Sequence, residues 1–284
     1  MQADDDDETV TTATSKSQSS QQPAWMRQPF NRCKEWLSSL PEKFNTLPAQ
    51  PGENQDPLYR LFSREGAICR RLLGQVQRDL SDVVKVCQGE LKQTNHLCSL
   101  VSSLTKGTIP NHWRIYKVPK AMAVSGWVAN FAKWLTQLDS IAGVDNLNNV
   151  EVWLDGLFYP EAYITATRQA VAHRKKWSLE MWNLILDIER VNDPGAFIID
   201  GLALEGASWA TDKLMLNNGE VVQLNPSQIR RWVQSDDTAR GNLVNLPVYL
   251  NNDRSDMLFT VDLPFDSSAG LLAATRAACL TTAG

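Results

Sequence analysis

The sequence predicts an α+β protein in which an N-terminal helical bundle precedes an antiparallel β-barrel or sandwich with one packed helix. Three observations indicate this fold class. Apolar residues recur at helical spacing up to about residue 148, and beyond it they alternate with polar residues in short runs. Residues 160–175 are the only long helical segment within the second half, so we expect this helix to cover or plug the sheet.

Residues 1–55 are expected to form a disordered tail, a short helix and a linker. Residues 1–22 contain the acidic run DDDDE followed by Thr, Ser and Gln, a composition that predicts a disordered tail. Residues 23–55 begin with a short helix that extends to about Leu40. The rest of this segment contains three prolines and a glycine, which is typical of a linker.

Residues 56–148 are expected to form the helical subdomain. Asp56 and Pro57 are typical of a helix start, with aspartate as the cap and proline at the first helical position. One apolar stripe then follows until Gly89 interrupts the pattern, which predicts a single long amphipathic helix.

A second helix is predicted from about Leu91 to a stop at Gly107, and Pro119 opens a third. Each striped helix must bury its stripe and the connections are short, so a small helical bundle is expected. A coiled coil is the alternative, but the apolar run is too short and too irregular for one.

Residues 149–284 are expected to form the β-barrel-like subdomain. The runs at 150–158 and 184–188 alternate or nearly alternate apolar with polar residues, and DPG at 193–195 indicates a turn. The strongest local signal is KLMLNNGEVVQL at 213–224, where two apolar runs flank Asn-Asn-Gly and predict a hairpin. The runs IRRWV, NLVNLPVYL and MLFTVDL supply three more strands, which favours a barrel or sandwich.

The overall composition argues against several classes of protein. The net charge of −4 gives no electrostatic case for nucleic-acid binding, and no apolar run is long enough for a membrane helix. The five cysteines are odd in number and scattered, which favours reduced thiols. The ten tryptophans either fill the cores and the seam between the halves, which is the preferred reading, or form an aromatic platform for a sugar or a partner.

Familiar catalytic and cofactor motifs are absent from the sequence. It contains no P-loop, and Lys106-Gly107 lies at a helix end before a proline, so we expect no nucleotide site or other cofactor. His96, His112 and His173 fall in three different elements without cysteines at matched spacing, so no metal site is predicted. No local nucleophile signature is present either, and the chain is expected not to be an enzyme.

Charged residues near the predicted junction between the halves have two readings each. Arg168 and Arg254 are candidates for fixed pairing beside packed aromatic residues, with an exposed, unpaired position as the alternative. Four carboxylates could include the acid pair of a glycosidase, although a solvated rim is preferred: Asp139, Asp145, Asp155 and Glu161.

Several long motifs resemble the C-terminal region of dynein heavy chains. They are GLFYPEAYITATRQ at 156–169, LALEGASW at 202–209 and LPVYLNNDRSDMLFTVDL at 246–263. The resemblance extends from about Asp56, where DPLYRLFSRE opens the long helix, to Leu263. The residues of the first and third motifs resemble those of the cytoplasmic, cargo-carrying type of heavy chain rather than those of the axonemal type.

This resemblance implies a module of a microtubule motor. Dynein heavy chains hydrolyse ATP in a ring of AAA modules and walk towards microtubule minus ends. Their C-terminal region is a non-catalytic helical part and β-barrel part that lies on the ring, touches its first and last modules, and tunes force and processivity. The resemblance further implies a cytoplasmic, cytoskeleton-associated chain whose partners are that ring and, through the parent chain, the other dynein subunits.

Helix 160–175 is expected to join the two halves. The residues expected at the junction or at an interface are Tyr163, Thr165, Arg168, Gln169, Trp209 and Arg254. Whether the chain is a piece of a longer motor or a stand-alone product stays open. The rival functions are a stand-alone Trp-rich β adaptor that binds a peptide or glycan, and a hydrolase that uses Asp155 or Glu161.

Overall fold

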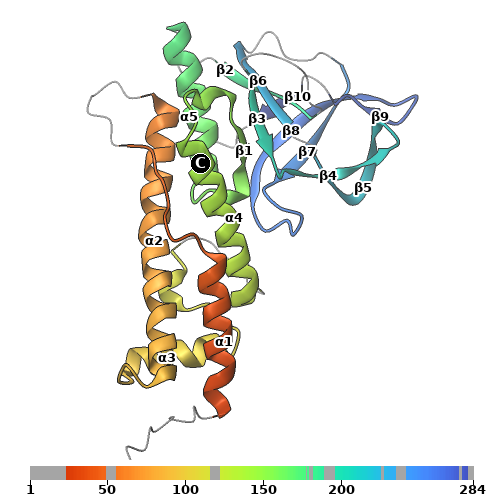
Figure 1. Cartoon of the computed structure of the whole chain (residues 1–284). Helices are drawn as coiled ribbons and strands as arrows, with labels where there is room; N and C mark the ends of the chain where they lie inside the picture. Colours follow the sequence, from red (N-terminus) through yellow and green to blue (C-terminus); the bar gives the residue numbers. More distant parts are fainter. Residues whose placement is uncertain are drawn as a thin grey trace, which may run out of the picture.

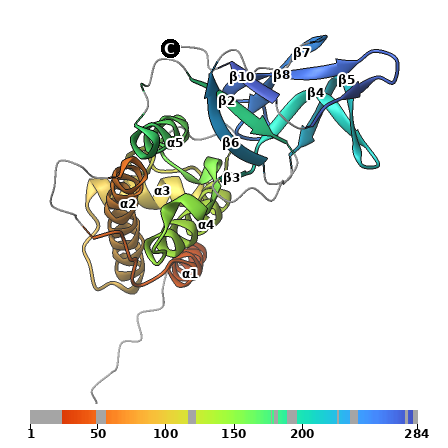
Figure 2. The same ribbon diagram turned by 90° about the horizontal axis from the view of Figure 1, so that it is seen from above.

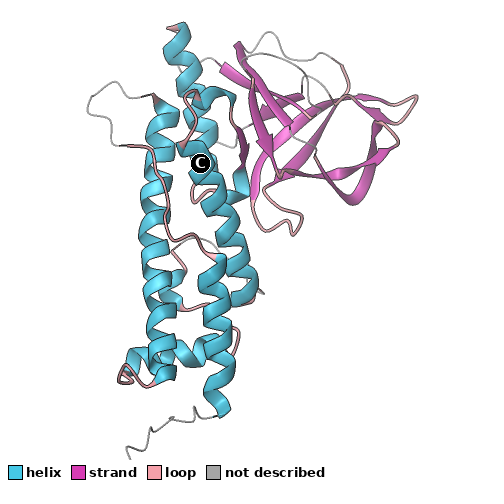
Figure 3. Ribbon diagram, in the orientation of Figure 1, coloured by secondary structure: helices cyan, strands magenta, loops and turns pink. Residues whose placement is uncertain are grey.

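The structure is a computed structural model in which helices and strands occupy separate regions (Figures 1 and 3). Four helices form an elongated bundle, and a β-barrel lies beside one end of it, so the predicted α+β class is confirmed. None of the helices among the described residues has both the length and the apolarity needed to cross a bilayer. The structure describes residues 24–48, 56–115, 122–176, 178, 182–188, 196–224, 227–234, 241–274 and 277–280.

Helix α1 (Ala24–Ser39) packs against the long helix α2 (Pro57–Gln88). The side chain of Asp56 accepts hydrogen bonds from the backbone N–H groups of Leu58 (2.8 Å) and Tyr59 (3.3 Å), which satisfies donors that the first turn leaves free. At the other end Gly89 adopts a left-handed conformation with φ of 78° and closes the helix. Both predicted ends of this helix are confirmed. The predicted tail at 1–22 and the part of the linker at 49–55 lie outside the described residues.

Helices α3 (Asn95–Thr105) and α4 (Val124–Ala142) complete the bundle. The predicted start of α3 near Leu91 is wrong by about one turn. Thr94 supplies the cap instead, because its hydroxyl accepts from the backbone N–H of Leu97 at 3.3 Å. Pro119 lies outside the described residues.

The bundle core is built around stacked aromatic rings. The ring of Trp127 stacks on those of Trp113 and Phe131, each with a centroid separation of 5.2 Å. Trp36 and Trp134 are also buried, which supports a packing role for these tryptophans. Buried apolar residues form one continuous cluster that extends from α1 into the barrel, so the two regions share a core.

Helix α5 (Pro160–Lys175) lies between α2 and the strands, as the view from above shows (Figure 2). Three one-turn 3₁₀ helices, η1 (Asn111–Trp113), η2 (Leu147–Asn149) and η3 (Leu154–Gly156), occupy connecting segments. The strands are β1 (Glu151–Trp153), β2 (Trp182–Asp187), β3 (Phe197–Asp200), β4 (Ala203–Ala210), β5 (Lys213–Gln223), β6 (Ser227–Gln234), β7 (Leu243–Tyr249), β8 (Met257–Asp266), β9 (Leu271–Leu272) and β10 (Ala277–Leu280).

The strands form a closed barrel with an extension. Strands β8, β7, β4, β5 and β9 close on themselves, because β9 pairs with both β5 and β8. The edge of β8 opposite β7 also pairs with β10, from which β2, β6, β3 and β1 continue the sheet towards the helices. Pairing is antiparallel except between β1 and β3. The extension therefore connects the barrel to the helical bundle.

The hairpin predicted around Asn-Asn-Gly at 217–219 is wrong. Strand β5 runs through that segment, and the chain reverses earlier, at Thr211 and Asp212, where Thr211 adopts φ of 58°. The pairing partner on β5 jumps from Leu216 to Val221 opposite Gly206, so the Asn-Gly segment forms a bulge and not a turn. A bulge and a turn both need left-handed backbone, which is why the local sequence did not distinguish them.

Candidate functional site at the junction of helices and barrel

The segment 151–159 connects the bundle to α5, and side chains from two helices form hydrogen bonds with its backbone; each of these contacts is called a hold. The first hold is Glu65 of α2, whose side chain is fully buried. Its two carboxylate oxygens accept hydrogen bonds from the backbone N–H groups of Phe158 (2.7 Å) and Tyr159 (3.1 Å). The guanidinium of Arg64 lies over the Tyr159 ring, 4.5 Å from its centroid. Glu65 thus fixes the start of α5 to the N-terminal part of α2.

Burial dominates the chemistry of Glu65. Removal from water raises its pKa from 4.5 to about 7, although the two N–H donors and the nearby Arg64 act in the opposite direction. The first hold on the junction is therefore a carboxyl group that titrates near neutral pH.

The second hold is Gln137 of α4. Its amide oxygen accepts from the backbone N–H of Trp153 at 2.7 Å, and its amide nitrogen donates to the carbonyls of Trp153 (3.1 Å) and Gly156 (3.4 Å). A single side chain therefore satisfies three backbone groups where β1 passes into η3. This also corrects the sequence prediction, because the run 150–158 is a strand only over β1 and then turns into a 3₁₀ helix.

The indole ring of Trp153 lies between two glycines. A Cβ added to Gly156 would lie 2.5 Å from one edge of the ring, and a Cβ added to Gly201 would lie 2.4 Å from another. Gly201 follows β3 with φ of 83°, so both its conformation and its surroundings favour glycine. Trp153 thereby connects the segment held by Gln137 to the turn between β3 and β4.

Of the predicted site residues on α5, Tyr163 lies deepest in the junction. It is fully buried and its ring lies 6.0 Å from that of Phe62 on α2. Burial raises the pKa of its phenol well above the usual range, and its hydroxyl has no hydrogen-bond partner among the described residues. Arg168 is half-buried, whereas Thr165 and Gln169 are exposed, so the four residues do not face one way.

The other two predicted residues, Trp209 and Arg254, lie on the barrel. Trp209 is half-buried on β4 against the core. Arg254 lies in the loop between β7 and β8, and its guanidinium contacts the Glu205 carboxylate of β4 at 2.6 Å. The structure therefore places these two apart from the α5 residues, although the loop that Arg254 anchors reaches the junction.

A cavity of about 220 Å³ lies at the junction, beside the start of α5. Asp155 and Glu161 line it together with Asp256 from the β7–β8 loop. Burial and the neighbouring Asp253 raise the pKa of Asp155 to about 6. The other two carboxylates considered from the sequence are not part of this lining: Asp139 accepts a hydrogen bond from the Asn45 backbone (2.8 Å), and Asp145 is exposed.

Comparison with known proteins identifies the family. The family model that describes the C-terminal domain of the dynein heavy chain matches residues 2–282. The protein belongs to this family. A cytoplasmic dynein heavy chain of Drosophila melanogaster is 40% identical over 93% of this chain, and one of Dictyostelium discoideum is 36% identical over 82%. A ciliary dynein beta chain of Heliocidaris crassispina is 26% identical over 78%.

These identities confirm the dynein resemblance and agree with the predicted cytoplasmic type. The chain spans 6% of the Drosophila relative and 5% of the other two. Its own structure is therefore that of a dynein C-terminal domain, and the activity of a whole heavy chain is a separate matter.

The two residues that hold the junction of this dynein C-terminal domain, Glu65 and Gln137, were not predicted. Both interrupt an apolar stripe: Glu65 follows Phe62 on α2, and Gln137 lies beside Leu138 on α4. A polar residue at a buried helix position needs a partner, and that signal was available in the sequence. The partners were not, because Glu65 and Phe158 are 93 residues apart.

Proposed function

We propose that this chain is the non-catalytic C-terminal module of a cytoplasmic-type dynein heavy chain. In this proposal it docks on the AAA ring of the same heavy chain, at the first and last modules, and tunes the force and processivity of a minus-end-directed motor. The chain acts in the cytoplasm on microtubules, and the other dynein subunits reach it through the parent chain. Family membership and the higher identity to the cytoplasmic relatives support this role.

The observation that carries the proposal is the double hold on segment 151–159. A module that touches two parts of a ring can couple them only if its own halves do not slide past each other. Glu65 and Gln137 oppose such sliding, because movement would break their hydrogen bonds to partly buried backbone groups and leave the buried Glu65 carboxyl without its N–H donors. The shared apolar core acts in the same direction.

A non-catalytic role also fits the sequence, which contains no P-loop. The rival reading, a Trp-rich adaptor, calls for indole rings on the surface. In the β half, Trp153 lies between Gly156 and Gly201 and Trp209 is half-buried against the core, and these positions favour packing over a binding platform.

The test uses a heavy-chain motor truncated before the part that corresponds to Asp56. The purified 284-residue chain is added back, and its binding to the ring is measured by biolayer interferometry. We expect saturable binding, and a change in stall force or run length when the motor and this module are rejoined. Absence of binding, together with unchanged motility of the truncated motor, would refute the proposal.

A junction variant sharpens the test. Glu65→Ala combined with Gln137→Ala loosens the junction, while Glu35→Ala changes an exposed residue of α1 and serves as the control. Circular dichroism establishes that both variants retain their helices and strands. We expect the double variant to bind the ring but to lose its effect on stall force, and the control to behave as the unmodified protein does.

A further inference from the structure

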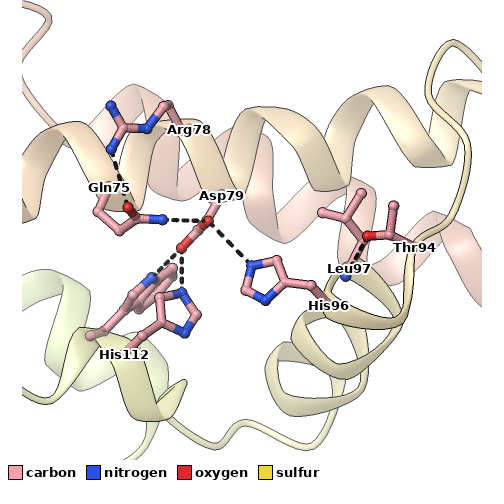
Figure 4. A network of polar contacts seen from close by, with 8 residues as sticks. Gln75, Arg78, Asp79, Thr94, His96, Leu97 and His112 are labelled. Carbon is pink, nitrogen blue, oxygen red and sulfur yellow. Dashed lines mark hydrogen bonds and ion pairs between the residues drawn. The ribbon is translucent and has the colours of Figure 1, made fainter.

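Two histidines and one aspartate from three elements converge at the end of the bundle remote from the barrel (Figures 1 and 4). Asp79 lies on α2, His96 on α3 and His112 in η1. The Nε2 atom of His112 lies 2.6 Å from Asp79 Oδ2, and that of His96 lies 3.9 Å from Asp79 Oδ1. One ligand atom from each residue lies within 4.8 Å of the others.

The carboxylate at the centre of this cluster is held in place from behind. Asp79 is 4% exposed, and its Oδ2 accepts from the indole N–H of Trp113 at 2.7 Å. The side-chain amide of Gln75 donates to Oδ1 at 2.9 Å. Hydrogen bonds of this kind fix the orientation of a ligating carboxylate in metal sites.

We propose that Asp79, His96 and His112 form a binding site for a Zn²⁺-type transition-metal ion. Two imidazole nitrogens and one carboxylate oxygen are ligands that zinc accepts, and three protein ligands leave a fourth position open. His96 and His112 also line a cavity of about 220 Å³, so water or an incoming donor can reach that position.

Occupation requires a small rearrangement. Metal–ligand bonds of about 2.0–2.2 Å in a tetrahedron separate neighbouring ligand atoms by about 3.3 Å. The His112–Asp79 pair must therefore open by less than 1 Å, roughly, and any separation as long as 4.8 Å must shorten by about 1.5 Å. The side chain of His96 is 60% exposed and that of His112 is 36% exposed, so both can adjust without disturbing the core.

The ion would connect three elements that the backbone leaves separate. Asp79 and His112 are 33 residues apart, and the rings of His96 and His112 lie 5.3 Å apart at their centroids. To bind the ion, Nε2 of His112 must present its lone pair, so the ion replaces the direct contact between this nitrogen and Asp79 Oδ2.

The experiment is an isothermal titration calorimetry measurement, in which Zn²⁺ is titrated into the full 284-residue protein. Cys98 is replaced by serine in every sample, because it is exposed and could bind zinc on its own. We expect a stoichiometry of one Zn²⁺ per protein molecule. Co²⁺ serves as a second probe, and the visible absorption of a tetrahedral Co²⁺ complex is the expected signature.

Three variants locate the site. His96→Gln and His112→Gln each remove a ligand and should weaken Zn²⁺ binding by more than about 100-fold, whereas Gln75→Ala removes an orienting bond and should weaken it about 10-fold. His173→Gln on the exposed surface of α5 is the control and should bind as the parent does. His96 is exposed, so its variant should fold normally. Equal binding by the His96→Gln and His173→Gln proteins, or no 1:1 complex with either ion, would overturn the proposal.

Discussion

Glu65 provides the sharpest test of how the junction is stabilised. Its pKa is raised from 4.5 in the unfolded state to about 7 in the folded protein, chiefly because it is buried. Between those two pH values the folded state retains a proton that the unfolded state has already lost. The stabilising contribution is therefore complete below about pH 4.5 and is lost progressively as the pH rises to about 7.

The difference between the two pKa values sets the size of the effect. A rise from 4.5 to about 7 corresponds to about 3 kcal/mol of unfolding free energy, as an upper value. Glu65→Gln removes the titrating group but keeps one carbonyl acceptor, as the protonated acid does. At pH 5 the parent and the variant should therefore differ by less than about 1 kcal/mol. At pH 8 the variant should be the more stable of the two by as much as about 3 kcal/mol.

The assay is urea unfolding at pH 5, 6, 7 and 8, monitored by tryptophan fluorescence. Comparison with Glu65→Gln cancels the titration of every other group, so only the difference between the two pH profiles matters. Parallel profiles would refute the reasoning. So would a growing advantage of the parent at higher pH, because the N–H donors of Phe158 and Tyr159 would then outweigh burial.

Three further predictions concern the same junction. Gln137→Ala leaves three partly buried backbone groups without this partner and should cost about 1–3 kcal/mol, measured by urea unfolding. Gly201→Ala should lower the unfolding free energy by about 2 kcal/mol more than Gly89→Ala does, as measured by thermal unfolding. Both glycines have positive φ, but only Gly201 has the Trp153 ring beside it. Equal losses in the two variants would contradict this packing. Tyr163→Phe should stabilise the protein by about 1 kcal/mol, because it removes a buried hydroxyl without a described partner. Tyr163→Ala should instead lower the unfolding free energy by about 3–5 kcal/mol. A loss of stability in the Phe variant would show that the hydroxyl has a hydrogen-bond partner.

Sequence reasoning succeeded where the controlling interactions are local. The start of α2 depends on Asp56 and its own next two or three residues, and its end depends on the conformational freedom of Gly89. The order of a bundle before a barrel followed from periodicity alone. The hairpin at 217–219 failed because the choice between a turn and a bulge was made by pairing with β4, which the local pattern does not contain.

The candidate sites show the same limit more strongly. Tyr163 was recognisable as a buried aromatic residue, yet its partner Phe62 comes from a helix about one hundred residues earlier. His96 and His112 were assigned to separate elements, which is correct, but the assignment gave no sign that both would meet Asp79. Polar residues inside apolar stripes mark such positions, although they do not identify what satisfies them.

Both polar sites depend on one helix. Glu65 and Asp79 are 14 positions apart on α2, so they lie about 21 Å apart along its axis at 1.5 Å per residue. Glu65 binds the segment 151–159, and Asp79 contacts residues of α3 and η1 at the far end of the bundle. Both contacts are made from the buried face of a continuous helix without an internal proline, which is the stiffest connection available between them. These contacts therefore oppose movement of the barrel relative to the far end of the bundle, which is the property that the proposed docking across two parts of a ring requires.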